Sequence, residues 1–204
     1  PFDDTIKQYI SKAEVIWAME TAKLGKSPGT DGIPTEFYYK LYKNDNELLA
    51  RFLTEVYNES YNQEKLSKSM REIQIRLLFK KTSVEARLDP KNYRPISLLN
   101  CDYKLMSKIL ASRLKPYMTK MLPEEQSGLP GRYIADPINF TQAAIQFAAY
   151  TNKPWMVLFL DFEKAFDSVD HEYTFKVMEA LGIPAEFIRW AKLAFTDTSA
   201  ACIV

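Results

Sequence analysis

The chain has 204 residues, of which 47% are apolar and 26% are charged, and its formal net charge is +1. These values are typical of a globular protein with one sizeable core or two small subdomains, and they exclude an intrinsically disordered chain. No apolar run is long enough to span a bilayer, and the N-terminus has no basic region followed by an apolar one. The sequence therefore predicts neither a membrane segment nor a signal peptide.

The two cysteines, Cys101 and Cys202, have no metal-ligand spacing and form no disulfide framework. This usage indicates a reducing, intracellular compartment. Because the chain does not begin with methionine, we expect it to be a segment of a larger protein.

The charges are segregated along the chain. Residues 1–63 contain 7 Lys/Arg and 10 Asp/Glu, residues 64–120 contain 14 and 5, and residues 121–204 contain 6 and 11. The middle segment, with a net charge of +9, predicts a face that binds phosphates beside acidic segments that hold cations. The alternative is a chance excess of charge on exposed helices.

The first predicted element is a helix from Asp3 to Leu24, because apolar residues recur there at helical spacing. Asp3 or Asp4 is expected to cap its start, and Gly25 its end. We interpret the aspartate pair as a cap and not as a catalytic pair, because acidic residues favour the first turn of a helix.

Residues 25–34 contain three glycines and two prolines, which predicts a structured turn that acts as a rigid connector. The turn is not a phosphate loop, because it lacks the GxxxxGK[ST] spacing and no buried strand precedes it. Two further helices are predicted at 34–43 and 46–62.

A β-hairpin is predicted next. Residues 71–77 alternate apolar and polar side chains, which predicts a half-buried strand that runs on toward Lys81. Residues 92–99 supply the partner strand, in which Pro95 requires an edge or a bulge. The hairpin carries Lys80 and Arg94, and these side chains are suited to phosphate, although a single basic residue on a hairpin is usually a solvated surface residue.

Beyond the hairpin, residues 103–118 predict a helix with one apolar face. Its basic residues lie off that face and either follow a nucleic-acid backbone or are solvated. These residues are Lys104, Lys108, Arg113 and Lys115. A loop rich in helix breakers follows at 122–132, and then a helix of mixed polarity at about 136–150.

Residues 155–160 are six consecutive apolar residues, which predicts a strand buried on both faces. Asp161 follows it directly. A carboxylate at such a place needs a strong partner, and it either caps the helical turn at 163–166 or binds a metal ion. From the residues alone, Phe166 on that turn is predicted to be a core residue.

The last predicted elements are helices at 172–181 and 185–195 and a strand that begins at residue 200. The single histidine, His171, follows Asp170 at a helix start and is left without a role. Trp155 and Trp190 are predicted to be core residues.

Several motifs of the chain resemble those of the non-LTR (long interspersed element type) retrotransposon reverse transcriptases. LDFEKAFDSVDH at 160–171, followed by LGIP at 181–184, resembles the first catalytic segment. SPGTDGIP at 27–34 looks like the N-terminal extension motif, and NYRPISLL at 92–99 looks like the fingers motif. QSG at 126–128 and GR at 131–132 also match, although Phe is commoner than Leu at position 129.

The resemblance implies a two-metal phosphoryl transfer that adds deoxynucleotides to a primer 3′-hydroxyl on an RNA template. In this family Asp161 would bind both Mg²⁺ ions. Phe162, next to it, would contribute to the metal and nucleotide sites. Phe166 would lie under the sugar of the incoming nucleotide and exclude a 2′-hydroxyl.

The resemblance also assigns binding roles to residues of the hairpin. Lys80 and Arg94 would bind the triphosphate, while Tyr93, Pro95 and Ile96 would line the template. Phe79 stands where many relatives have Pro, which leaves open whether the lysine is 80 or 81.

The implied fold is α+β: the fingers and first part of the palm of a right-hand polymerase, with helices packed on an antiparallel sheet. The chain would end before the aromatic-x-Asp-Asp hairpin, which does not occur in the sequence. The domains would be a helical N-terminal extension at 1–63, fingers at 64–150 and the first palm segment at 151–204.

Two consequences follow for function. With one of three expected metal carboxylates, the chain alone is predicted to be inactive. Its expected partners are an RNA template, a DNA primer and deoxynucleoside triphosphates. We expect it to act inside the cell and, in a eukaryote, on nuclear chromosomal DNA.

The alternative functions are a non-catalytic RNA/DNA-binding module derived from such an enzyme and a bare helical scaffold. The residues do not indicate an oligomeric state.

Overall fold

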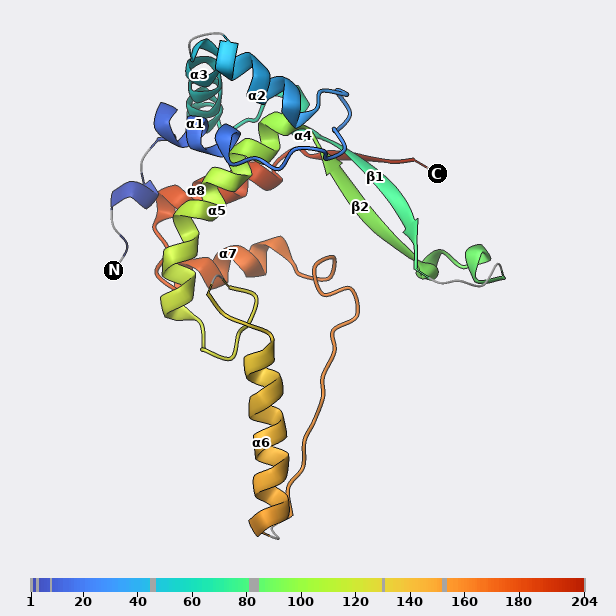
Figure 1. Ribbon diagram of the computed structural model, residues 1–204. Coiled ribbons are helices and arrows are strands. Elements are labelled where there is room, and N and C mark those ends of the chain that lie inside the picture. Colours follow the sequence, from blue (N-terminus) through green and yellow to red (C-terminus); the bar gives the residue numbers. More distant parts are fainter. Residues whose placement is uncertain are drawn as a thin grey trace. The chain divides into compact units, whose positions relative to one another are not determined.

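The computed structural model describes residues 2, 4–7, 9–44, 47–80, 85–129, 131–151 and 154–203 (Figure 1). The chain forms two compact units. The hairpin unit comprises Asp3–Ala111 and Pro184–Val204, and the α6 unit comprises Pro1–Phe2 and Ser112–Ile183.

The hairpin unit contains most of the helices and all three described strands. Its helices are η1 (Asp4–Lys7), α1 (Lys12–Glu20), α2 (Thr35–Asn44), α3 (Leu48–Asn62), α4 (Lys68–Arg71), η2 (Glu85–Leu88), η3 (Pro90–Asn92) and α8 (Ala185–Phe195). Its strands are β1 (Glu72–Phe79), β2 (Tyr93–Leu99) and β3 (Ser199–Ile203). Helix α5 (Cys101–Met121) begins in this unit and ends in the α6 unit, which also contains α6 (Ala135–Thr151) and α7 (His171–Ala180).

The helices predicted from apolar periodicity after residue 34 are confirmed. In α5 the predicted inner face is buried in the hairpin unit, with Met106 fully enclosed and Leu105 and Ile109 at most 3% exposed. Trp190 of α8 is also fully buried, as predicted, and its ring lies 4.5 Å from that of Tyr61. Apolar spacing at 3.6 residues therefore located the core of this unit.

The predicted N-terminal helix is wrong in its extent. The structure has the short η1 and then a separate helix, α1, that begins after Ser11. Ser11 forms a capping box with Glu14: the Glu14 amide donates to the Ser11 hydroxyl, and the Ser11 amide donates to the Glu14 carboxylate. A capping box fixes a helix start more firmly than a lone aspartate, which explains the break. Asp3 lies outside the described residues.

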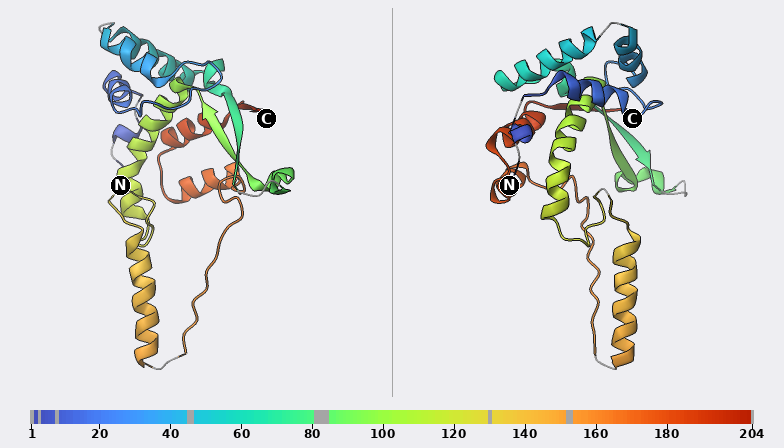
Figure 2. Two further views of the ribbon diagram at one scale, coloured as in Figure 1. Left: turned by 45° about the vertical axis from the view of Figure 1, so that its right-hand side comes forward. Right: turned by 60° about the vertical axis from the view of Figure 1, so that its left-hand side comes forward.

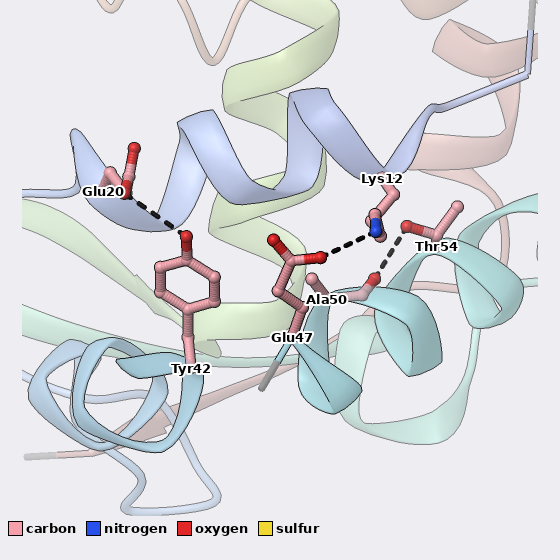
Figure 3. Close-up of polar contacts among 6 residues, drawn as sticks. All are labelled: Lys12, Glu20, Tyr42, Glu47, Ala50 and Thr54. Carbon is pink, nitrogen blue, oxygen red and sulfur yellow. Dashed lines mark hydrogen bonds and ion pairs between the residues drawn. The ribbon is translucent and has the colours of Figure 1, made fainter. Parts of the chain in front are cut away.

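Polar contacts join α1 to α2 and α3 (Figure 3). The Lys12 ammonium lies 2.7 Å from the Glu47 carboxylate, and the Tyr42 hydroxyl donates to Glu20 at 3.4 Å. Both partners in the Lys12–Glu47 pair are partly exposed, so the pair contributes little to stability. Packing of Val15, Ala18 and Met19, all essentially buried, holds α1 in place.

The three strands form one sheet in the order β2-β1-β3. β1 and β2 are antiparallel, as the hairpin prediction requires, and Pro95 lies on the edge strand. β3 pairs with β1 in parallel, so the expectation of a wholly antiparallel sheet is wrong. The end of the β1–β2 hairpin that carries η2 and η3 extends away from α1, α2 and α3 of the same unit (Figure 2).

Asn100 joins the connector at 25–34 to the hairpin base and to α5. It is 1% exposed, its Nδ2 donates to the Ser69 carbonyl at 2.7 Å, and its Oδ1 accepts from the Asp31 amide at 3.2 Å. The Cβ that an alanine would carry at position 29 would lie 2.0 Å from Asn100 Oδ1. The connector is therefore anchored to α5, as expected of a rigid turn.

Asp102, two residues further on, extends this anchor. Its carboxylate accepts from the Tyr103 amide at 2.7 Å and from the Ser69 hydroxyl, and its carbonyl accepts from the Tyr57 hydroxyl at 2.8 Å. Burial raises the pKa of the Asp102 carboxyl, while the hydrogen bonds from Ser69 and Tyr103 oppose that shift.

The α6 unit contains the largest departure from prediction. Residues 154–162 form no strand and are exposed; Leu158 is 73% exposed and Trp155 55%. A strand needs a neighbour for its backbone groups, and this segment pairs with none among the described residues. The predictions of a buried strand here and of a core position for Trp155 are therefore wrong. The Trp155 ring instead meets Phe147 of α6 edge-on, at 6.1 Å.

Arg132 closes the loop between α5 and α6. Its guanidinium donates to the carbonyls of Thr119 at 2.8 Å, Leu122 at 3.0 Å and Gln126 at 3.2 Å. It thus satisfies carbonyl groups at the end of α5 that lack an intrahelical partner.

Among the described residues, no helix is long and apolar enough to cross a membrane.

Candidate active site

Three basic side chains lie on one face of the β1–β2 hairpin. Arg76 is opposite Ile96, and Leu78 is opposite Arg94. Opposed residues of an antiparallel pair point to the same side, and alternate residues along a strand share a face. The Lys80 amide donates to the Asn92 carbonyl at 2.8 Å, which continues this register past the end of β1. Arg76, Lys80 and Arg94 are therefore on one side of the ribbon, here called the cationic face.

The cationic face is open to solvent. Arg76, Lys80 and Arg94 are all exposed. None of them forms an ion pair with a described residue, so each guanidinium or ammonium group is available to an anion. Lys81, the alternative to Lys80, lies outside the described residues.

The opposite face of the hairpin is aromatic. The rings of Phe79 and Tyr93 lie 5.2 Å apart, and the Arg87 guanidinium lies 5.4 Å from the Phe79 ring. The Tyr93 hydroxyl also donates to the Arg87 carbonyl at 3.1 Å. Of the three residues predicted to line the template, Tyr93 and Pro95 share this aromatic face, whereas Ile96 lies on the cationic face.

Asp161 is exposed in the α6 unit, at the end of the extended segment. Its carboxylate accepts no hydrogen bond from any described residue, so it does not cap the turn at 163–168. That turn is closed by Ser168, whose amide donates to the Lys164 carbonyl at 3.0 Å. The capping interpretation is therefore wrong, and the carboxylate is free to meet a cation.

The two phenylalanines near Asp161 are also on the surface. Phe162 is 79% exposed and Phe166 is 97% exposed. The interpretation of Phe166 as plain core is therefore wrong.

Asp170 caps α7, as expected for a residue at a helix start: its carboxylate accepts from the Tyr173 amide at 2.8 Å. His171 is the first residue of α7 and is exposed. It belongs to the α6 unit, and nothing in its position assigns it to acid–base chemistry.

The basic residues of α5 serve structural contacts. The Lys104 ammonium donates to the Ser27 carbonyl at 3.0 Å, and the Lys108 ammonium donates to the Ala18 carbonyl at 3.1 Å and to the Thr21 hydroxyl at 2.6 Å. Burial lowers the pKa of the Lys108 ammonium. Arg113 is 9% exposed. Of the four, only Lys115 is classed as exposed, which removes most of the support for a nucleic-acid track along this helix.

Sequence reasoning missed two parts of the hairpin. Arg76 belongs to the cationic face, and the period-two spacing of Arg76, Leu78 and Lys80 could have identified it. The contact of Arg87 with Phe79 had no sequence signal, because it depends on how the hairpin tip folds back.

Magnesium ligands are carboxylates, and the fit of the residues to two Mg²⁺ ions is incomplete. Within the described ranges, no cluster of three or more His, Cys, Asp or Glu side chains could hold a metal ion. Asp161 supplies one exposed carboxylate in the α6 unit, while Lys80 and Arg94 belong to the hairpin unit.

A protein-family model described as "Reverse transcriptase (RNA-dependent DNA polymerase)" matches residues 79–201. "Transposon TX1 uncharacterized 149 kDa protein" of Xenopus laevis is 33% identical over 196 residues, which cover 96% of this chain and 14% of the relative. "Probable RNA-directed DNA polymerase from transposon BS" of Drosophila melanogaster is 29% identical over 164 residues, 78% of this chain and 17% of the relative.

A third relative is the "Retrovirus-related Pol polyprotein from type-2 retrotransposable element R2DM" of Drosophila melanogaster. It is 26% identical over 169 residues, which cover 83% of this chain and 15% of the relative. The chain thus spans only 14% to 17% of the length of these relatives. Because the family match covers more than half of the chain, and because the relatives are transposon proteins, the chain belongs to the reverse transcriptases of non-LTR retrotransposons.

Proposed function

We propose that this chain is the N-terminal extension, fingers and first palm segment of an RNA-directed DNA polymerase. The complete enzyme adds deoxynucleotides to a primer 3′-hydroxyl on an RNA template. The observation that carries the proposal is the cationic face, an exposed face with three basic side chains on the hairpin that bears the family's fingers motif.

Lys80 and Arg94 bind the triphosphate of the incoming nucleotide. An arginine guanidinium binds phosphate oxygens through two parallel hydrogen bonds, whereas a lysine acts as a point charge. Together they stabilise the negative charge that develops on the leaving pyrophosphate. The backbone near Tyr93, Pro95 and Ile96 lies along the template, where the hairpin presents aromatic surface on its other face.

Asp161 and Phe162 contribute to the magnesium site. When bound, the two Mg²⁺ ions neutralise charge on the attacking and leaving oxygens. Asp161 is the carboxylate that this chain contributes to holding them. One carboxylate does not hold two divalent ions, so the two-ion site needs further ligands besides Asp161.

Replacing Arg94 by alanine tests the role of the cationic face. We expect the variant to bind a fluorescent deoxynucleoside triphosphate several-fold more weakly, because a charge-assisted contact with phosphate is lost. Fluorescence anisotropy measures this affinity. Arg51→Ala is the matched control, since Arg51 is an exposed arginine on α3 of the same unit. If both variants lost the same affinity, the cationic face would have no special role.

Phe166 is the proposed selector of deoxynucleotides. In the complete polymerase, Phe166→Ala should reduce the preference for deoxynucleotides over ribonucleotides by roughly tenfold to a hundredfold, the range for removal of one steric contact. Single-nucleotide incorporation with matched deoxy- and ribonucleoside triphosphates measures this ratio. Phe140→Ala, which removes an exposed ring on α6 that has no proposed role in the site, is the matched control. An unchanged ratio would remove Phe166 from the nucleotide site.

A second candidate function is a non-catalytic RNA/DNA-binding module derived from such an enzyme. It is favoured by the combination of a cationic face with only one exposed site carboxylate. An experiment on the complete polypeptide distinguishes the two functions, because the module would bind a template–primer duplex with normal affinity and extend no primer.

In a eukaryotic cell, the polymerase would act on nuclear chromosomal DNA.

A further inference from the structure

Asn100 lies between the last residue of β2 and the first residue of α5, where the hairpin joins the helices of its unit. Its backbone is held by α5, because its carbonyl accepts from the Lys104 amide at 3.1 Å. Its side chain is 1% exposed and uses both polar atoms of its amide group. Nδ2 donates to the Ser69 carbonyl at 2.7 Å and to the Thr30 hydroxyl at 3.1 Å, and Oδ1 accepts from the Asp31 amide at 3.2 Å.

These hydrogen bonds tie together the roots of both hairpin strands. Ser69 belongs to α4, which runs directly into β1, and Asn100 follows β2 directly. The bonds from Asn100 to Thr30 and Asp31 join both roots to the connector. The Ser69 hydroxyl adds a further bond, to the Asp102 carboxylate. We call Asn100, Ser69, Thr30 and Asp31 the root clamp.

The outer part of the hairpin has little else to fix its direction. The pairing with β3 ends at Arg76, and beyond it the described ribbon has only two strands. Residues 76–78 of β1 and 94–97 of β2 are exposed. The one ion pair beside the start of β3, between Asp197 and Arg71 at 3.7 Å, is largely solvated on the Asp197 side and contributes little. The direction in which the hairpin leaves the helices is therefore set mainly at its root.

A small rotation at the root becomes a large displacement at the cationic face. Lys80 is eight residues beyond Glu72, the first residue of β1. At a rise of about 3.3 Å per residue this separation is about 26 Å, so a tilt of about 5° would move Lys80 by roughly 2 Å. A misplacement of about 1 Å can lower a reaction rate about a hundredfold.

We propose that Asn100 is a positioning residue: through the root clamp it sets the direction of the β1–β2 hairpin and so holds Lys80 and Arg94 at the triphosphate. An amide suits this role because one side chain supplies both the donor to the Ser69 carbonyl and the acceptor for the Asp31 amide. The effect on catalysis rests on the proposed function, whereas the effect on hairpin direction does not.

The first measurement tests hairpin direction in the full chain. Spin labels on Arg51→Cys in α3 and Leu88→Cys in η2, both exposed positions, report their distance distribution by pulsed electron paramagnetic resonance, with the exposed thiol removed by Cys202→Ser. Asn100→Ala and Asn100→Asp should broaden this distribution by roughly 2 Å or more, the displacement for a tilt of about 5°. Met19→Ala is the matched control, because it truncates a core side chain of α1 and keeps the root clamp. Its distribution should be as narrow as the parent's.

The second measurement tests the consequence for the reaction. In the complete polymerase, the affinity for a fluorescent deoxynucleoside triphosphate should fall at least about tenfold in both Asn100 variants and stay unchanged in Met19→Ala. A role in stability alone would not separate these variants. Thermal unfolding verifies that each is folded. Should neither Asn100 variant fold, Thr30→Val removes one bond of the root clamp at an exposed residue and should broaden the distribution to a smaller degree.

A distribution as narrow as the parent's in the variants of the root clamp overturns the proposal. A broadened distribution with an unchanged triphosphate affinity also overturns it, and Arg94→Ala then shows which premise failed. If Arg94→Ala still weakens triphosphate binding, only the positioning role of Asn100 is wrong. If it does not, the proposed triphosphate site on the cationic face is wrong as well.

Discussion

Asp161→Asn in the complete polymerase is expected to lower the rate of primer extension by at least roughly a thousandfold, equivalent to about 4 kcal/mol of activation free energy. Asparagine keeps the size of the side chain but removes the negative charge that holds the divalent ions. Binding of the template–primer duplex should change little, since the proposed template contacts lie on the hairpin. Single-turnover extension with Mg²⁺ and deoxynucleotides measures the rate, and anisotropy measures the binding.

Asp167→Asn is the matched control, because Asp167 is an exposed carboxylate on the adjoining turn. It should retain most of the activity. The 204-residue chain alone should extend no primer, because it carries only one site carboxylate. Extension by the chain alone that Asp161→Asn abolished would contradict that expectation, and equal losses in the two variants of the complete enzyme would mean that Asp161 has no special role.

Gly29→Ala is expected to destabilise the hairpin unit by about 3 kcal/mol or more, near the upper end for an overpacked site. The new Cβ would lie 2.5 Å from the Asn100 amide nitrogen and 2.6 Å from the Leu99 carbonyl carbon. Both are backbone atoms, and they belong to the hairpin base and the start of α5, so neither can move freely. For a chain of this length we expect the melting temperature to fall by roughly 10 °C.

The control is Gly128→Ala, where the nearest outside atom, Gln126 Nε2, would be 3.9 Å from the new Cβ. That change should alter the unfolding free energy by no more than about 0.5 kcal/mol. Thermal and urea unfolding, followed by circular dichroism, compare the two variants. A Gly29→Ala protein as stable as the Gly128→Ala protein would mean that the connector is not packed against Asn100.

The elements that sequence could predict are those specified by local patterns. Apolar spacing located α2, α3, α5, α7 and α8, alternation located β1, and β2 was predicted as the partner strand of β1. The observed register of this hairpin places Lys80 and Arg94 on one face. The start of α1 is also marked in the sequence, because Ser11 and Glu14 have the spacing of a capping box.

The rest depends on interactions between distant parts of the chain. Residues 155–160 have the composition of a buried strand, but burial requires a partner strand, and the described residues supply none. The parallel pairing of β3 with β1 joins residues more than a hundred positions apart, which no local pattern specifies. For the same reason, the exposure of Asp161 and Phe166 could not be read from their neighbours in sequence.

The close approach of Gly29 to Asn100 also constrains how this chain can be engineered. A chimera that exchanged the first 63 residues for those of a related element would replace one side of this contact and keep the other. The donor must therefore carry residues at positions 29 and 100 that pack together as Gly29 and Asn100 do, or the exchanged segment must extend past residue 100. Recombination breakpoints placed between the connector and the hairpin would separate two surfaces that fit only as a pair.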